Sequence, residues 1–126
     1  MNQLVNIYRI LSDETRLRII ILLAQKELCV CELSHILAVS QPTVSKNLSK
    51  LRDMNLVTTE RKEKFIFYKL KTENAILERT VKGILDNLDD YPQLIIDKNK
   101  YVNNKKILDQ CCMSRNGQEK KKIQEN

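Results

Sequence analysis

Four cysteines form two close pairs in this chain, Cys29 with Cys31 and Cys111 with Cys112. Thiolates are soft ligands, so paired cysteines suit soft metal and metalloid ions as well as redox chemistry. In a reducing compartment such pairs are more often metal-binding or redox-active than structural disulfides. Neither pair has the C-x-x-C spacing, which argues against the usual zinc-ribbon and thioredoxin-like sites. The sequence therefore predicts a thiol site of another kind.

The composition predicts one domain built mainly from helices. The chain has 126 residues, of which 42% are hydrophobic, and it contains only 2 Gly and 2 Pro. Few turn-forming residues favour long helices over a many-turned β fold. The sequence shows neither an apolar run of membrane-spanning length nor the pattern of an N-terminal signal peptide. We therefore expect a cytoplasmic protein with no membrane partner.

The charges are unevenly distributed along the chain, whose net charge is +6. Residues 41–71 hold eight Lys and Arg against three Asp and Glu, a net charge of +5. Residues 73–97 carry a net charge of −4, and residues 98–126 again carry +5. A basic centre beside an acidic stretch indicates a localised face that binds a polyanion. The alternative is a set of solvated helix faces followed by a basic tail.

The spacing of apolar residues predicts six helices and one strand-like region. The helices are expected over residues 2–11, 13–25 behind an N-cap at Ser12, 30–37, a stretch capped by Ser40, 73–90, and part of 94–111. In the first of these helices Leu4, Ile7, Tyr8 and Leu11 repeat at helical spacing, and in the second Leu17, Ile20, Ile21 and Ala24 are expected to face inward. Alternating side chains over residues 65–70 predict a strand, paired with residues 56–60 through a turn at 61–63.

Two short helices joined by a tight turn and followed by a hairpin form the layout of a winged helix-turn-helix. In the helix behind Ser40, the residues expected to face inward are Val44, Leu48 and Leu51. The outward residues are Gln41, Thr43, Ser45, Lys46, Asn47, Ser49 and Lys50. Such side chains can contact base edges and phosphates, and residues 41–50 contain no acidic group to repel phosphate. We interpret this helix as a recognition helix rather than an ordinary solvated helix.

The hairpin would then be the wing of this domain. Its tip carries the basic residues Arg61, Lys62 and Lys64, which we expect to contact the phosphate backbone. The tip lacks the glycine that is typical of tight hairpin turns.

The segments LSDETRLRII, ELCVCEL, SQPTVSKNLSKLRD, LV and FIFYKL follow one another in an order and spacing that resemble the ArsR/SmtB family of metal-sensing repressors. The resemblance covers roughly residues 4–72. It implies a winged helix-turn-helix protein, mainly α with a β-hairpin, that forms a homodimer through its first and fifth helices. It also implies a repressor that binds double-stranded operator DNA when metal-free and releases it when a metal or metalloid binds.

Three regions are expected on this basis. Residues 1–92 would form the winged helix-turn-helix domain with its dimerisation helices. Residues 93–113 would form a C-terminal helix that carries the second cysteine pair, and residues 114–126 a disordered basic tail.

Within this family, ELCVCEL resembles the thiol site of arsenic and cadmium/lead sensors. Two thiolates one residue apart at the start of a helix can hold one soft ion, and a helix N-terminus favours the thiolate form. The alternative is that Cys29 and Cys31 are small buried hydrophobic residues. The arsenic sensors with a third cysteine three residues after the second have a complete site in one helix, but this chain has Ser34 at that position.

The remaining metal ligands must therefore come from elsewhere. Residues 1–12 contain no cysteine, although the cadmium/lead sensors draw additional thiols from an N-terminal extension. We expect Cys111, Cys112 or both to complete the site, from the same or the other subunit; an incidental cysteine pair is the alternative. The family's second site uses His and carboxylates on the fifth helix, and residues 73–90 contain no His.

The expected inducer is thus trivalent arsenic or antimony, with Cd(II) or Pb(II) as the first alternative and a thiol-redox switch as the second. No organic cofactor is expected. A small thiol enzyme is disfavoured, because the sequence has no C-x-x-C motif and no phosphate-cradling loop. Its single histidine, His35, follows Cys31 by four residues, but we expect it to be exposed or partly packed rather than a ligand or a base.

Overall fold

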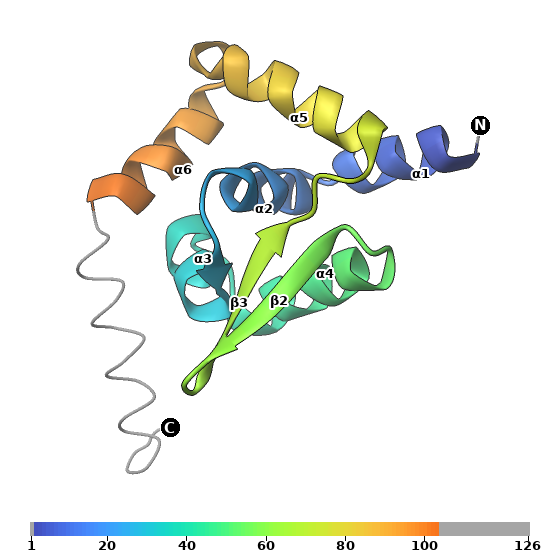
Figure 1. Cartoon of the computed structure of the whole chain (residues 1–126). Helices are drawn as coiled ribbons and strands as arrows, with labels where there is room; N and C mark the ends of the chain where they lie inside the picture. Colours follow the sequence, from blue (N-terminus) through green and yellow to red (C-terminus); the bar gives the residue numbers. More distant parts are fainter. Residues whose placement is uncertain (1, 104–126) are drawn as a thin grey trace.

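The computed structural model describes residues 2–103, which form six α-helices, one short 3₁₀ helix and a three-stranded antiparallel sheet (Figure 1). The helices are α1 (Asn2–Leu11), α2 (Glu14–Gln25), α3 (Val30–Leu37), α4 (Gln41–Asp53), α5 (Ala75–Asp86), η1 (Leu88–Asp90) and α6 (Pro92–Asn103). The strands are β1 (Leu28–Cys29), β2 (Val57–Lys62) and β3 (Phe65–Leu70). The predicted winged helix-turn-helix architecture is confirmed. Within the described residues, no helix is both long enough and apolar enough to cross a membrane.

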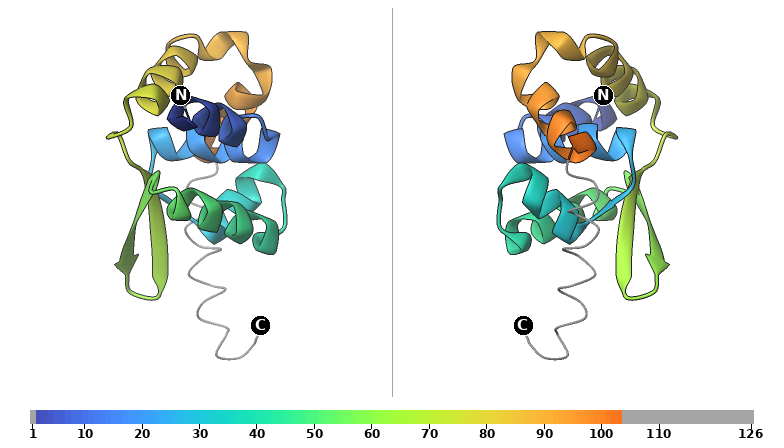
Figure 2. Two further views of the ribbon diagram at one scale, coloured as in Figure 1. Left: turned by 90° about the vertical axis from the view of Figure 1, so that its right-hand side faces the viewer. Right: turned by 90° about the vertical axis from the view of Figure 1, so that its left-hand side faces the viewer.

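Helix α2 lies at the centre of the domain, surrounded by the other elements (Figures 1 and 2). Ile19, Ile20, Ile21, Leu22 and Leu23 are each at most 2% exposed. A helix that is apolar on every side has to be covered on every side, and α1, α3, α5, α6 and β3 all contact it. The predicted stripe was too narrow, because it included only the second and third of these five residues. Each fully buried Ile or Leu contributes about 1.5–3 kcal/mol, so this helix organises the core.

Helices α3 and α4 form the helix-turn-helix. Helix α3 ends at Leu37 and is followed by its C-cap Ala38, whose backbone is left-handed with φ of 58°. The Ser40 side chain caps α4, and Pro42 lies in its first turn, where the missing N–H costs nothing. The stripe that packs inward consists of Val44, Leu48 and Leu51, all 0% exposed. The predicted cap, proline position and buried stripe are therefore confirmed.

The sheet contains a strand that the sequence pattern did not predict. Strand β1 has only two residues, Leu28 and Cys29, which pair with Tyr68 and Phe67 of β3. The strand order is β1-β3-β2, so the first cysteine belongs to the same sheet as the wing. A two-residue strand has no periodicity of its own, and only its long-range pairing defines it.

The turn of the wing is also shorter than predicted. Strand β2 continues to Lys62, which pairs with Phe65, so Glu63 and Lys64 alone form the turn. Glu63 has φ of 59°, in the left-handed region that residues other than glycine rarely adopt. A tight hairpin turn requires a residue with positive φ, and here Glu63 adopts that conformation in place of a glycine.

Several helix boundaries differ from the predicted ones. The N-cap of α2 is Asp13 rather than Ser12, because the Asp13 carboxylate accepts the Arg16 backbone N–H at 3.0 Å. Helix α5 begins after an Asn74 cap and ends at Asp86, and the separate η1 follows it. In α1 the buried residues are Ile7 and Ile10. Tyr8, a member of the predicted apolar stripe, is 54% exposed in the single chain, and Val5 is 44% exposed.

Helix α6 is attached to the core by a buried ion pair. Arg18 of α2 donates from Nε and Nη2 to the two carboxylate oxygens of Asp97, both at 2.9 Å. The side chains are only 13% and 2% exposed, and Asp97 also accepts from Gln93. The hydrogen bond to Asp97 raises the pKa of Arg18, so the guanidinium stays charged. Arg18 and Lys100 also donate to the backbone carbonyls of Leu37 and Ile36, at the end of α3.

Replacing Asp97 by Asn should strongly destabilise the domain. The substitution leaves the guanidinium of Arg18 buried without its counter-charge, which typically costs about 3–5 kcal/mol. The measurement is the free energy of unfolding from urea denaturation at a fixed protein concentration. Asp90→Asn, at an exposed carboxylate, is the matched control and should change it by less than about 0.5 kcal/mol. Equal effects of the two substitutions would contradict this assignment.

Candidate thiol site and nucleic-acid interface

Cys29 lies at the junction between the sheet and the helix-turn-helix. It is the last residue of β1, where it pairs with Phe67, and it is also the N-cap of α3. Its backbone N–H donates to Oε1 of Glu32 at 3.0 Å, and Glu32 is itself only 7% exposed. A glutamate three residues after an N-cap is a recognised capping signature, so the sequence contained a signal for this contact.

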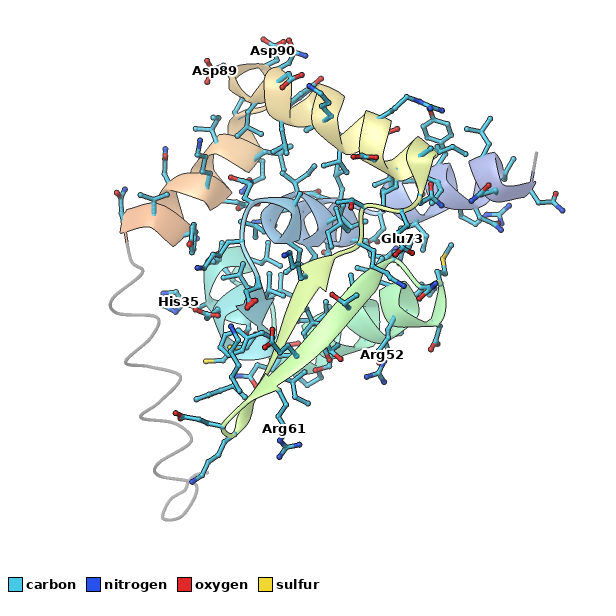
Figure 3. The ribbon with its side chains drawn as sticks, in the orientation of Figure 1. His35, Arg52, Arg61, Glu73, Asp89 and Asp90 are labelled. Carbon is cyan, nitrogen blue, oxygen red and sulfur yellow. The ribbon has the colours of Figure 1, made fainter. Side chains whose placement is uncertain are left out.

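The two thiols differ in their exposure. Cys29 is 4% exposed and belongs to the core, whereas Cys31, in the first turn of α3, is half-buried. The pair therefore does not occupy one buried face, although Cys29 alone fits the description of a small buried residue. His35 is exposed and points away from the domain on the outer side of α3, as Figure 3 shows.

The described residues supply thiols of the right chemical type for a soft ion, but not a complete ligand set. Among residues 2–103, no group of three or more His, Cys, Asp or Glu side chains is arranged to hold a metal ion. Cys111 and Cys112, the other predicted ligands, lie outside the described residues. A site with three thiolates would thus need Cys29 and Cys31 together with ligands from beyond residue 103 or from another subunit.

The outer face of α4 presents most of the side chains that were predicted for DNA contact. Thr43, Ser45, Lys46 and Lys50 are exposed, while Gln41 is half-buried. The hydroxyl of Thr43 accepts a hydrogen bond from Ser40 at 2.9 Å, so it takes part in the helix cap.

Asn47 departs from the predicted outward orientation. It is half-buried, and its Oδ1 accepts from Nη1 of Arg16 at 3.4 Å. Its Nδ2 donates to the Thr43 carbonyl at 3.0 Å. No sequence pattern indicates this contact, because Arg16 precedes Asn47 by 31 residues and only the packing of α2 against the helix-turn-helix brings them together.

The basic residues of the wing have different surroundings. Arg61 and Lys64 are exposed. Lys62 instead donates to Oε2 of Glu27 at 2.6 Å, and its ammonium lies 5.2 Å from the ring centroid of Phe67. The hydrogen bond between them lowers the pKa of Glu27 and raises that of Lys62, so both groups stay charged at neutral pH.

Two arginines of α4 and the wing lie at the end of the domain opposite to two aspartates of η1. In Figure 3 the guanidinium groups of Arg52 and Arg61 point from α4 and the wing toward the lower side, whereas Asp89 and Asp90 lie at the top. Arg52, in the last turn of α4, was not among the predicted contact residues, although its charge was visible in the sequence. Asp89 and Asp90 are therefore too far from α4 to repel an anion bound at its outer face.

Comparison with known proteins identifies the family. Residues 13–59 match the model of the bacterial regulatory proteins of the arsR family. An arsenical resistance operon repressor of Staphylococcus aureus is 39% identical over 82 residues, which cover 65% of this chain and 77% of that protein. The chain belongs to the arsR family. Its ArsR-type helix-turn-helix is the α3–α4 unit described above, and the family is one of regulatory proteins.

Two further relatives delimit the similarity of this ArsR-family chain. The arsenic resistance transcriptional regulator ArsR1 of Pseudomonas putida is 38% identical over 82 residues, which span 64% of each protein. The matched stretch is thus less than two thirds of that regulator's length. The crystal structure of the transcriptional repressor BigR from Xylella fastidiosa superposes with a TM-score of 0.59 at 34% identity, covering 66% of this chain and 83% of BigR.

The difference in burial predicts different thiol reactivities in this ArsR-family protein. With Cys111 and Cys112 both replaced by Ser, Cys31 should react with a thiol reagent such as DTNB at least about tenfold faster than Cys29, because Cys29 must await local opening. Peptide mass spectrometry at increasing reaction times would assign the two rates. In urea the rates should converge, and equal rates in the folded protein would contradict the described burial.

Proposed function

We propose that this chain is a transcriptional repressor that binds operator DNA and releases it when trivalent arsenic or antimony binds its cysteine thiolates. The observation that carries this proposal is the dual position of Cys29. One residue ends the strand that pairs with the wing and begins the helix that supports the recognition helix. A change at this thiol would therefore reach both of the elements that contact DNA in a winged helix-turn-helix.

Cys29 and Cys31 would supply two of the thiolates, and we assign the third to Cys111 or Cys112. Trivalent arsenic takes three thiolates, and residues 2–103 contain no other cysteine. Drawing Cys29 toward Cys31 would disturb its backbone pairing with Phe67 and its hydrogen bond to Glu32. The coupling between the thiol site and the DNA-binding surface is then a difference in free energy between two arrangements of β1 and α3.

For DNA contact we assign Gln41, Thr43, Ser45, Lys46 and Lys50 to the recognition helix. Arg61, Lys62 and Lys64 are assigned to the wing, and the predicted contact Asn47 is retained as a residue at the edge of the interface. The exposed polar face of α4, without any acidic group over residues 41–50, supports this assignment.

A homodimer through α1 and α5 completes the proposal. Val5 and Tyr8 on α1 are large apolar residues with 44% and 54% of their surface exposed in the single chain. Packing against a second copy would cover them, and two α4 helices would then address two half-sites of a palindromic operator.

Two alternatives keep the same fold and the same thiols. Cadmium or lead would favour a fourth thiolate, which the second cysteine pair could also provide. A redox switch would oxidise one of the pairs to a strained, easily reduced disulfide. Adding arsenite, antimonite, cadmium, lead or peroxide separately to the protein–DNA complex distinguishes these alternatives.

Arsenite or antimonite should weaken operator binding by the reduced protein, and Cys29→Ser or Cys31→Ser should abolish the effect. Fluorescence anisotropy with DNA from upstream of its own gene measures the affinity. A coupling typical of allosteric proteins predicts a change of roughly 5- to 150-fold. His35→Gln, an exposed neighbour, should respond normally, and Cys111→Ser and Cys112→Ser would assign the third ligand.

Other outcomes of the same experiment point elsewhere. Release by cadmium or lead alone, or by peroxide alone, would replace the arsenic proposal with the corresponding alternative. Failure of the folded, dimeric protein to bind any upstream DNA would overturn the repressor proposal itself.

Lys46→Met should weaken operator binding without changing the affinity for the inducer. Loss of one phosphate contact should reduce the slope of log affinity against log salt by about 0.9. Lys82→Met, which removes an exposed lysine of α5, is the matched control and should leave the slope unchanged. If Lys46→Met weakened inducer binding to the same extent, the separation of the two sites would be wrong.

A further inference from the structure

We propose that Arg16 is a positioning residue that fixes the recognition helix through Asn47, and that it acts on operator binding without contacting DNA itself. The inference rests on the proposed DNA binding and adds to it a residue on α2, outside the helix-turn-helix and the wing.

Arg16 links three helices. Its Nε donates to the backbone carbonyl of Ile10 at 3.1 Å, and its Nη1 donates to Oδ1 of Asn47 at 3.4 Å. Its backbone N–H is held by the carboxylate of the N-cap residue Asp13 at 3.0 Å. The guanidinium therefore projects from a fixed start of α2 and joins the end of α1 to the middle of α4.

The contact at α1 is favourable for a general reason. The last carbonyl groups of a helix have no partner within the helix, and a cation near this end interacts well with the helix dipole. Ile10 is buried, so its carbonyl lies beside the core rather than in solvent. The fork of an arginine can serve two acceptors at once, whereas a lysine carries a single ammonium.

The contact at α4 fixes the rotation of that helix. Asn47 uses its oxygen for Arg16 and its nitrogen for the Thr43 carbonyl, so its carboxamide lies along the helix surface. The buried stripe of α4 is aliphatic, and such contacts are not directional. The directional hydrogen bond between Arg16 and Asn47, at the edge of the stripe, therefore fixes the rotation of α4 about its axis. That rotation sets where the exposed residues Lys46 and Lys50 point.

The competing explanation is that Arg16 binds a DNA phosphate directly. The two explanations differ in salt dependence, because a lost phosphate contact lowers the slope of log affinity against log salt by about 0.9. They differ also in a double-mutant cycle. A residue that acts through Asn47 should have little further effect once Asn47 is replaced.

The experiment measures operator affinity by anisotropy at several salt concentrations for five proteins and one control variant. The five are the wild type, Arg16→Ala, Arg16→Lys, Asn47→Ala and the Arg16→Ala/Asn47→Ala double variant. Arg16→Ala and Asn47→Ala should each weaken binding about tenfold, as expected for a lost hydrogen bond to a charged group. The double variant should bind no more than about twofold more weakly than Asn47→Ala, with the salt slope unchanged.

Arg9→Ala is the matched control, since Arg9 is an exposed arginine of α1 whose guanidinium donates to the nearby Asn6 side chain at 3.3 Å. It should bind as the wild type does. Arg16→Lys keeps the charge but not the fork, so it should not restore affinity. Sedimentation and urea unfolding would verify that each variant is a folded dimer. If Arg16→Ala does not fold, the affinities of Arg16→Lys and Asn47→Ala still test the inference.

Additive effects, a salt slope reduced by about 0.9 in Arg16→Ala, or full affinity in Arg16→Lys would each overturn the inference. These outcomes require operator binding by the wild type. Absence of that binding would refute the proposed function instead, so the two failures are distinguishable.

Discussion

The covering of α2 is the constraint on which the rest of the structure depends. Its five consecutive aliphatic residues point to all sides of the helix and have to be shielded from water. The neighbouring helices and β3 therefore pack around it. Two arginines of this helix are half-buried rather than exposed. Arg16 and Arg18 end on groups of other elements, the first on α1 and α4, the second on α6 and the end of α3. The same helix that forms the core thereby connects the elements proposed for dimerisation, DNA binding and sensing.

The candidate thiol site lies where the sheet is joined to the helix-turn-helix. Cys29 joins a two-residue strand to α3, and Glu27 beside it holds Lys62 of the wing. The candidate thiol segment, the wing and α4 are thus linked through β1 and α3 by direct contacts. A change confined to one turn of α3 would have a short physical route to the surface that is proposed to bind DNA.

Much of this fold could be predicted because local interactions govern it. The Ser40 cap, Pro42 and the stripe of α4 are set by residues within one or two turns, and the alternation of β3 is equally local. The structure differs from the prediction where two neighbouring residues could both cap a helix, or where an element depends on residues far away in the sequence. Asp13 replaced Ser12 as a cap because both are good caps and the local geometry chose between them. Strand β1 exists only through its pairing with β3.

The sequence by itself determined the chemistry of this protein: a pair of thiols before a polar helix without acidic groups, a basic wing, and membership of a family of regulators. Tertiary structure alone decided how those groups are held. It buried Cys29 while leaving Cys31 half-exposed, directed Asn47 to Arg16, and paired Lys62 with Glu27. The physical reason is that residue type and short-range spacing fix what a side chain can do, whereas its partners 31 or 35 residues away are set by how the helices pack around α2.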